Sequence, residues 1–198
     1  MVKEEKIKLF NEVLKKESEA INLAIKNIKE EDVLKASEII FNCQGKVLVI
    51  ALGKSGYIGE KISASFSSMG IPSFFIHATE LFHGDFGRIE NNDVCLLFSH
   101  SGETNEVVEA AKLLKKRGNE LISITKTSQS SLAKLSDVSI NYLIEEESDH
   151  INMAPTSSST VTLAIGDALM VLVSKMKKYT KEDFVKNHPG GSLGKTKV

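Results

Sequence analysis

Apolar and polar positions follow two distinct periods along the chain, and these periods divide it into helices and strands. In residues 4–29 and 32–42, apolar side chains recur every 3.6 residues, which predicts two amphipathic helices. Residues 46–52 then form a short, continuous apolar run that is rich in β-branched side chains. Such a run is typical of a parallel strand that is buried on both faces. The chain is therefore predicted to begin with two helices that lead into a central strand.

The same succession of strand and helix continues to the end of the chain. Further strands are predicted at residues 73–76, 94–99, 120–125 and 138–143, and further helices at residues 57–69, 104–117, 130–135, 157–179 and 181–186. This alternation predicts right-handed βαβ units. The predicted fold class is α/β, a three-layer α/β/α doubly wound sheet of five parallel strands. Sheets of this kind bind ligands beyond the carboxyl ends of their strands, where the strand order reverses.

Composition narrows the classes of partner. The 198 residues suffice for one domain with a real core, and the 25 basic and 26 acidic residues leave a net charge of -1. This balance gives no electrostatic reason to expect nucleic acid or a membrane as a partner. The N-terminus lacks the apolar segment of a signal peptide, and Cys43 and Cys95 have no metal-ligand spacing. We therefore expect a cytoplasmic protein whose cysteines are small core residues.

The loop after the first predicted strand, residues 51–61, combines glycines with a lysine. Its glycines match neither the Walker A loop nor the dinucleotide-binding fingerprint. A glycine turn at a helix start nevertheless exposes backbone N–H groups and the positive end of the helix dipole. Gly53 and Lys54 are therefore candidate site residues, because the lysine ammonium is placed to meet an anion or a developing oxyanion. The alternative is a tight turn with a surface lysine.

Hydroxyl side chains gather in residues 99–104, between a predicted strand and a predicted helix. Ser99, Ser101 and Thr104 provide three hydroxyls, and Gly102 permits a positive φ. Together with free amides at the helix start, these groups suit the oxygens of a phosphate monoester without a metal. The alternative is an ordinary helix N-cap with an incidental serine.

Acidic and hydroxyl residues surround the start of the last long helix. Glu145, Glu146 and Glu147 follow the last predicted strand, and a carboxylate there would serve as a general base. Six hydroxyl residues lie in residues 156–162, more than one helix cap needs, which indicates either tight packing or a polar site wall. A solvated acidic loop is an equally good reading of the glutamates.

Two histidine-bearing turns complete the set of candidate positions. His188 begins a His-Pro-Gly-Gly turn near the chain end, where an imidazole can shuttle protons at neutral pH. His83 and Asp85 lie together in residues 80–87, but two side chains do not define a metal site. We therefore predict no metal.

Taken together, these motifs resemble the sugar isomerase (SIS) domain family. The sequence FSHSGETNEV resembles the phosphate-binding signature of that family. Within it, the chain is most similar to the arabinose-5-phosphate isomerases, through the stretches that contain LGKSGYIGEK, HATELFHGDFG, MAPTSSSTVT and NHPGGSLGK. The resemblance covers residues 38–195, and the His-Pro-Gly-Gly motif is its most discriminating part.

The resemblance implies reversible conversion of D-ribulose 5-phosphate to D-arabinose 5-phosphate, the first step toward the sugar acid Kdo. The reaction passes through a cis-enediol and needs no cofactor. The resemblance also implies a homotetramer with sites at subunit interfaces, where His188 reaches a neighbouring subunit. The chain is expected to be a single SIS domain over residues 1–198, without the CBS pair that usually follows. It divides into N-terminal helices (1–44), an α/β core (45–180) and a tail (181–198).

Site residues are carried over by the same resemblance. It assigns catalysis to Lys54, Glu103, Glu147 and His188. It assigns the phosphate to Ser55, Ser99, His100, Ser101 and Thr104, with Gly53, His83, Asp85, Thr156 and Ser157 as further substrate-site candidates. Either Glu147 or Glu103 moves the proton. His100 replaces the asparagine that is more usual between the two serines.

Two other functions remain open. One is a different SIS isomerase that acts on a hexulose or heptulose phosphate, against which the tail motif argues. The other is a non-catalytic sugar-phosphate sensor. Regulators of that kind carry a helix-turn-helix domain, and the N-terminal helical segment is too short for one.

Overall fold

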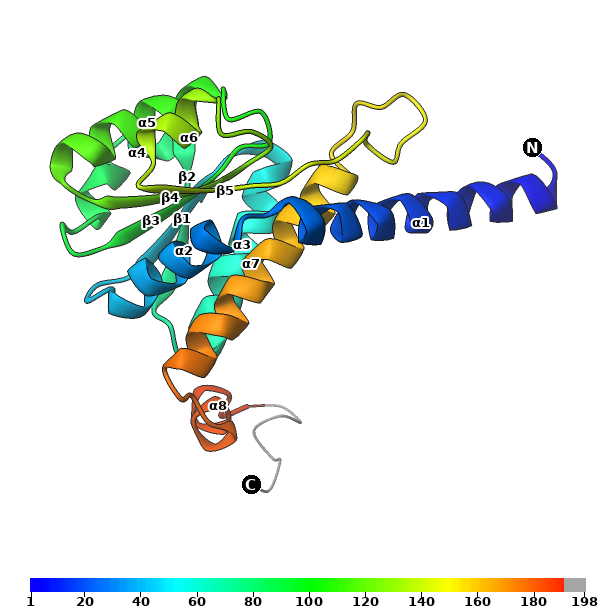
Figure 1. Ribbon diagram of the computed structural model, residues 1–198. Coiled ribbons are helices and arrows are strands. Elements are labelled where there is room, and N and C mark those ends of the chain that lie inside the picture. The colour runs from blue at the N-terminus through cyan, green and yellow to red at the C-terminus, as the bar shows by residue number, and fades with distance from the viewer. Residues whose placement is uncertain (191–198) are drawn as a thin grey trace.

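Five parallel strands form the centre of the computed structural model, which describes residues 1–190 (Figure 1). The strands are β1 (Val47–Ala51), β2 (Ser73–His77), β3 (Val94–Phe98), β4 (Glu120–Thr125) and β5 (Val138–Asn141), in the spatial order β2-β1-β3-β4-β5. The helices are α1 (Lys3–Asn27), α2 (Glu30–Asn42), α3 (Gly53–Ser68), α4 (Ala78–Leu81), η1 (Asp85–Arg88, a 3₁₀ turn), α5 (Asn105–Arg117), α6 (Ser131–Leu135), α7 (Ser157–Met176) and α8 (Lys181–Asn187). The predicted fold class is confirmed.

Each central strand supplies two hydrophobic cores, one on each face of the sheet. In β1, Val47, Val49 and Ala51 pack into one core, whereas Leu48 and Ile50 pack into the other. The first core lies under α1, α2, α3 and α7, and the second lies under α4, α5 and α6 (Figure 1). Because both faces are covered, the strands read as continuous apolar runs rather than as an alternation of apolar and polar residues.

The cysteines behave as the sequence predicts. Cys43 and Cys95 are both free, and Cys95 is fully buried in β3. Burial raises the pKa of the Cys95 thiol to about 12, so it is protonated and unreactive at neutral pH.

Some element boundaries differ from the sequence prediction. Helix α3 begins at Gly53, directly after β1, rather than at residue 57, because Gly53 adopts a positive φ of 60° that turns the chain at once. Helices α4 and η1 were not predicted, since four-residue turns are too short to show a period. Strand β5 ends at Asn141, two residues earlier than predicted.

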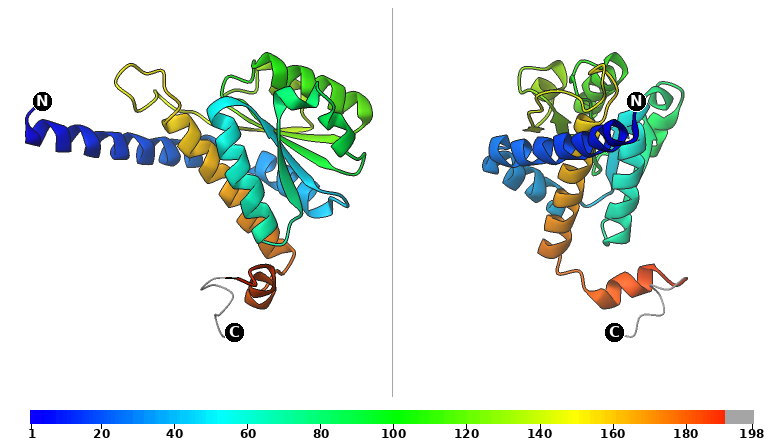
Figure 2. Two further views of the ribbon diagram at one scale, coloured as in Figure 1. Left: turned by 180° about the vertical axis from the view of Figure 1, so that it is seen from behind. Right: turned by 90° about the vertical axis from the view of Figure 1, so that its right-hand side faces the viewer.

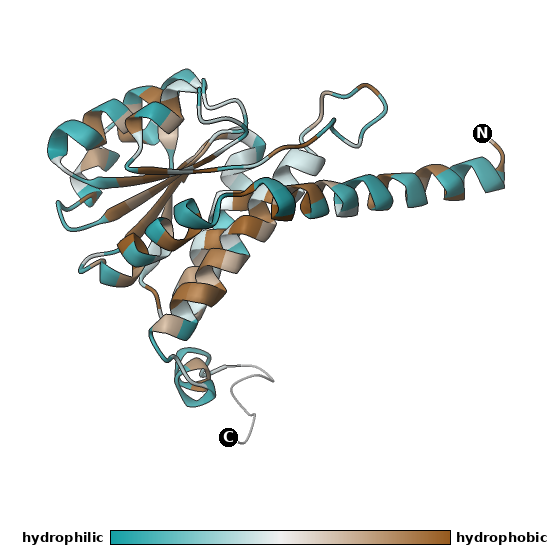
Figure 3. Ribbon diagram, viewed as in Figure 1, coloured by the Kyte–Doolittle hydropathy of each residue, from teal (hydrophilic) through white to brown (hydrophobic). Residues whose placement is uncertain are grey.

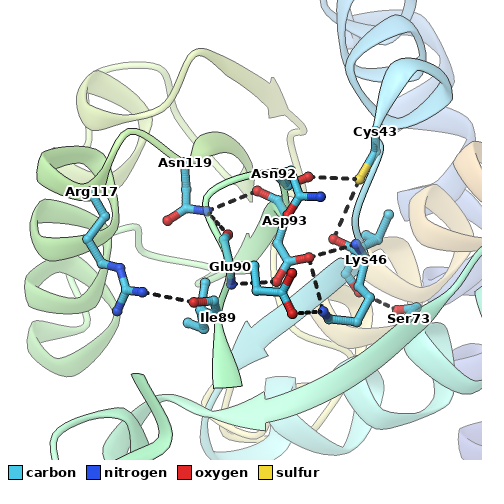
Figure 4. Close-up of polar contacts among 10 residues, drawn as sticks. Cys43, Lys46, Ser73, Ile89, Glu90, Asn92, Asp93, Arg117 and Asn119 are labelled. Carbon is cyan, nitrogen blue, oxygen red and sulfur yellow. Dashed lines mark hydrogen bonds and ion pairs between the residues drawn. The ribbon is translucent and has the colours of Figure 1, made fainter. Parts of the chain in front are cut away.

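A polar cluster joins the amino ends of β1 and β3, at the edge opposite the loops with candidate chemistry (Figure 4). The buried carboxylate of Asp93 accepts hydrogen bonds from the backbone N–H groups of Lys46 (2.7 Å) and Glu90 (2.8 Å). A Cβ on Gly45 would lie 2.3 Å from the same carboxylate, so only glycine fits there. Asn119 donates to the carbonyls of Glu90 and Asp93. This cluster fixes where the two central strands begin.

Helices α7 and α1 are the two longest helices of the layer formed by α1, α2, α3 and α7. Within residues 1–190, α7 alone is long and apolar enough to cross a membrane, but 56% of its apolar window is buried, as in a core helix. The N-terminal half of α1 projects beyond the rest of the domain, as Figure 1 and the left-hand view of Figure 2 show. Apolar residues punctuate this projecting half (Figure 3), and several of them are largely exposed.

Candidate active site

The candidate site lies at the carboxyl edge of the sheet, where the loops after the strands meet. The chain passes from β1 to β2 on one side and later enters β3 on the other side of β1. The strand order therefore reverses between β1 and β3, which is where sheets of this class bind ligands. The glycine-lysine turn follows β1 and the hydroxyl loop, residues 99–104, follows β3. Both predicted anion-binding loops thus flank the switch point.

The hydroxyl loop is organised by its own side chains. Ser99 is buried, and its Oγ lies 2.8 Å from Oγ1 of Thr104 and accepts a hydrogen bond from the Gly102 N–H at 3.0 Å. Ser101 is exposed, and its Oγ accepts from the N–H of Glu103 at 3.2 Å. Helix α5 begins directly after Thr104, so its first N–H groups lack intrahelical acceptors. The loop thus places hydroxyls beside a helix N-terminus, a combination that suits a phosphate.

Gly102 allows this loop to fold so tightly. Its φ is 70°, and a Cβ at this position would lie 2.2 Å from Oγ of Ser130 and 2.7 Å from Oγ1 of Thr125. Its carbonyl accepts a hydrogen bond from the N–H of Leu132 in α6 at 3.0 Å. The loop therefore packs tightly against α6 and has its conformation fixed before any ligand binds.

The turn after β1 supplies a cation next to the hydroxyl loop. Lys54 is exposed in the first turn of α3, with its Nζ 5.8 Å from the centre of the Tyr57 ring. Ser55 is half-buried in the same turn. The later glycines have a packing role, since a Cβ on Gly59 would lie 3.0 Å from the ring of Phe75. The first turn of α3 is thus the part of this motif that remains available to a ligand.

Glu147 is turned toward the start of α7. Its Oε2 accepts hydrogen bonds from the N–H groups of Thr156 (2.8 Å) and Ser158 (3.1 Å). Burial raises the pKa of this carboxyl, but the hydrogen bonds from Ser158 and Thr156 outweigh burial and leave the pKa below its ordinary value. Glu147 is therefore ionised at neutral pH, the form in which it can accept a proton.

The run of hydroxyls at the start of α7 is used mainly for packing. Oγ of Ser157 lies 2.7 Å from Oγ of the buried Ser148, and Oγ1 of Thr156 accepts from the Ser148 N–H at 2.7 Å. Thr162 donates to the carbonyl of Ser158, and Thr160 donates to Glu17 of α1. Of the two readings that the sequence left open, tight packing accounts for most of these groups. The substrate contacts predicted for Thr156 and Ser157 stay predictions.

His100 lies within the site but points away from the hydroxyl loop. Its Nδ1 is 2.8 Å from Oη of Tyr142, the residue that follows β5. Burial lowers the pKa of His100, although the carboxylate of Glu147 acts in the opposite direction. Burial also raises the pKa of Tyr142 to about 12, so both side chains are neutral at neutral pH. The contact of His100 with a phosphate stays a prediction.

An open cavity of about 520 Å³ lies between the ends of β4 and β5 and the acidic loop. His100 and Glu147 line it together with Lys126, which follows β4 directly. A neutral imidazole, an ionised carboxylate and a lysine thus face one space of the size of small-molecule sites. Glu146 lines it too, but its carboxylate is paired with Lys16 of α1.

Glu103 makes a different contact from the one the sequence suggested. Its Oε1 accepts a hydrogen bond from the N–H of Ser131 at the start of α6, at 2.8 Å. This contact lowers the pKa of the Glu103 carboxyl. The geometry gives Glu103 a positioning contact between the hydroxyl loop and α6. Its catalytic role stays a prediction.

The other predicted residues make contacts within their own segments or are exposed. His83 is exposed between α4 and η1, and Asp85 is paired with Arg88 at 2.9 Å. His188 follows α8, where its Nδ1 lies 2.7 Å from the carbonyl oxygen of Phe184 and its ring stacks on the Phe184 ring. The rest of the tail motif, from residue 191 on, lies outside the described residues.

The distance of His188 from the cavity follows from α7. This helix begins beside Glu147, and its 20 residues span roughly 30 Å before α8 follows (Figure 1). Within one chain, His188 therefore lies at the opposite end of the domain from the other candidate residues.

Three polar residues of the site were not found from sequence. Lys126 directly follows β4 and His77 ends β2, both at the carboxyl edge, so their positions in the pattern carried a usable signal. His77 is level with Ala51 of β1, and its Nδ1 lies 2.6 Å from Oγ1 of Thr79. Tyr142 carried no such signal, because its contact with His100 spans 42 residues.

Comparison with known proteins agrees with this geometry. The profile of the SIS domain family matches residues 40–172. The arabinose 5-phosphate isomerase KdsD of Pseudomonas aeruginosa is 45% identical over 165 residues, which are 83% of this chain and 51% of that protein. The arabinose 5-phosphate isomerase KpsF of Escherichia coli CFT073 is 42% identical over 93% of this chain and 56% of that protein. The chain thus spans about half the length of these curated relatives.

A solved structure shows the same similarity in three dimensions. The structure of E. coli CFT073 c3406 in complex with arabinose 5-phosphate superposes with a TM-score of 0.91 at 41% identity, and the match covers 96% of this chain and all of that one. The matched part of the family profile includes the hydroxyl loop and the start of α7. The chain belongs to the SIS domain family.

Proposed function

We propose that the chain is an aldose–ketose isomerase that interconverts D-ribulose 5-phosphate and D-arabinose 5-phosphate, the first step of Kdo biosynthesis. The observation that carries the proposal is the joint match to relatives named as arabinose 5-phosphate isomerases and to a structure with arabinose 5-phosphate bound. The site chemistry supports it, because the hydroxyl loop offers a phosphate anchor beside a cavity lined by an ionised carboxylate.

In the proposed mechanism, the phosphate binds the hydroxyl loop and the first turns of α3 and α5. A carboxylate removes a proton from C1 of the ketose, which gives a cis-enediol after proton transfer to the carbonyl oxygen. The proton then returns to C2 as the aldose forms. Glu147 is favoured as the carboxylate because it lines the cavity, whereas Glu103 is bound to Ser131. The ammonium of Lys54 stabilises the negative oxygen of the enediolate.

We further propose that the site is completed between subunits of a homotetramer. Support comes from His188, which lies at the far end of α7 from the cavity of its own chain. Its Nδ1–H donates to the Phe184 carbonyl, since a carbonyl can only accept, and this leaves Nε2 free to exchange a proton. A second copy would bring that nitrogen to the site. Two free cysteines fit action in the cytoplasm.

The test of the activity is NMR detection of arabinose 5-phosphate from ribulose 5-phosphate, with protein treated with a chelator. Hexulose and heptulose phosphates serve as competing substrates. Lys54→Ala is expected to lower kcat on the order of 10²-fold, since it removes a positioned cation. The matched control Lys61→Ala, on the same helix but paired with Asp167 at the surface, keeps near-normal turnover. Tight binding without turnover would favour the sensor instead.

Mixing subunits tests the shared site. Lys54→Ala and His188→Ala proteins are each expected to be nearly inactive alone. After unfolding and refolding together, they regain part of the activity if a site uses Lys54 of one subunit and His188 of another. No recovery in verified mixed oligomers would contradict the shared site and leave the isomerase activity standing.

A further inference from the structure

We infer that α1 pairs with the α1 of a second copy of this chain, antiparallel and about a two-fold axis between Glu17 and Ser18. The inference rests on the self-association proposed above and not on the isomerase activity. It concerns which surface joins two copies, and it starts from the projecting half of α1, which leaves the domain with apolar side chains exposed (Figures 2 and 3).

The exposed apolar residues of α1 form one stripe. Ile7, Phe10 and Leu14 follow each other at spacings of three and four residues, and their exposed fractions are 56%, 65% and 55%. Ile25 lies five helical turns after Ile7 and so on the same line, and it is 71% exposed. The stripe therefore runs the length of the helix rather than ending where the domain begins.

The opposite side of the same helix carries exposed charged residues. Lys8 pairs with Glu12 and Lys15 pairs with Glu19, each at a spacing of four residues. A free, singly amphipathic helical segment of this length is marginal in water, so the apolar stripe needs a partner surface.

The arrangement of the stripe identifies a second α1 as that surface. Its apolar positions are palindromic about the midpoint between Glu17 and Ser18. The mirrored pairs on this face are Leu14 with Ile21, Phe10 with Ile25, and Ile7 with Ile28, which directly follows the helix. Ile21 and Ile28 are partly buried against the core of their own domain and keep an exposed edge, whereas Phe10 and Ile25 are both largely exposed. In an antiparallel pair with a two-fold axis, each residue faces its mirror position on the partner, so Ile7, Phe10 and Leu14 each meet an isoleucine. An unrelated partner would give no reason for this symmetry.

The domain has an apolar groove that can bind the projecting end of the partner's helix. A groove of about 390 Å³ between α1 and α2 is lined by Ile25, Ile28, Val33 and Leu34, with Glu30 at its edge. Leu34 is 63% exposed. The antiparallel pairing brings Phe10 of the partner subunit to this groove, and the symmetric contact forms at the other end. Lysines and glutamates are nearly balanced in residues 3–17, so two copies of the helix do not repel.

The first test is the mass of the full chain by light scattering coupled to size exclusion. Phe10→Glu is expected to halve the mass, because it puts a charge between the apolar side chains of Ile25 and the groove on the partner subunit. Leu9→Glu is the matched control, since Leu9 is also exposed (44%) on the same turn but lies off the stripe, and it keeps the wild-type mass. Circular dichroism confirms that both variants fold. A wild-type mass for Phe10→Glu overturns the inference.

Cross-linking tests the direction of pairing. Ser18→Cys places a thiol beside the proposed axis, so a short bis-maleimide is expected to link two copies, whereas Glu19→Cys points to the opposite side and stays monomeric on a denaturing gel. The wild type, with only Cys43 and Cys95, gives the background. Equal linking of both variants, or none with Ser18→Cys, contradicts the pairing. A monomeric wild type would refute self-association itself, and an oligomer unaffected by Phe10→Glu would refute only the role of α1.

Discussion

Replacement of Gly102 by alanine tests whether the hydroxyl loop is held by packing against α6. The backbone at Gly102 cannot move freely, because its N–H donates to Ser99 and its carbonyl accepts from Leu132. The new Cβ would lie 2.2 Å from Oγ and 2.4 Å from Cβ of Ser130, so either the loop or α6 must shift.

The magnitude follows from two separate costs. A positive φ costs an alanine about 1–2 kcal/mol, and forcing a methyl group into packed structure adds about 1–3 kcal/mol. We expect Gly102→Ala to lower the free energy of unfolding by about 2–5 kcal/mol. Gly118→Ala is the control, because Gly118 has a φ of 88° at the end of α5 but no atom within 4 Å of its Cβ position. It should lose only about 1–2 kcal/mol.

Urea unfolding followed by circular dichroism measures both variants against the wild type. In a thermal scan, the melting temperature of Gly102→Ala should fall below that of Gly118→Ala by roughly 2–12 °C for a domain of this size. Because the loop shifts, KM for the proposed sugar-phosphate substrate should also rise in Gly102→Ala alone. Ser130→Gly in the same chain removes the contact with Ser130 but leaves the one with Thr125, so the double variant should recover part of the loss, about 1 kcal/mol, beyond the cost of Ser130→Gly alone. Equal destabilisation by the two alanines would refute the reasoning.

Three further outcomes follow from the charged and buried groups. Glu147→Gln should lose about 1–2 kcal/mol of stability at pH 7. Because the pKa of Glu147 is lowered in the folded state, its contribution to stability is present above the ordinary pKa and is lost as pH falls through the folded pKa. Urea unfolding of wild type and variant should therefore show a difference at pH 7 that vanishes at about pH 3. The folded pKa of His100 is lowered too, so the wild type should lose stability relative to His100→Asn as pH falls below the ordinary histidine value; parallel curves would contradict this. Asp93→Asn should cost about 2–4 kcal/mol through its lost backbone hydrogen bonds, while kcat per folded molecule stays unchanged.

The fold was predictable because its strongest determinant is local in sequence. Runs such as residues 46–52 are buried on both faces, and this burial explains both the apolar run and the parallel sheet. The loops at the strand ends could be placed for the same reason. Exact helix starts were harder, because the start of α3 depends on one positive φ at Gly53.

Contacts between distant loops could not be predicted in the same way. His100 meets Tyr142, and Glu103 meets Ser131, only because α5, β4 and α6 fold back between them. The sequence marked these residues as polar groups near strand ends, but only tertiary structure decides whether a carboxylate faces the cavity or a helix terminus. Glu147 does both, and no pattern within the acidic loop singles it out from its neighbours.

The double use of Glu147 has a consequence for comparing relatives. The carboxylate that lines the cavity also holds the first N–H groups of α7, the long helix beneath the sheet. A descendant that lost its activity would still be selected to keep an acidic residue here, because the helix needs it. Retention of this glutamate therefore indicates that the fold is kept and does not by itself indicate that the activity is kept. Under the proposed mechanism, Lys54, which is exposed and bonded to no carboxylate among residues 1–190, would be the better marker of whether a relative keeps the activity.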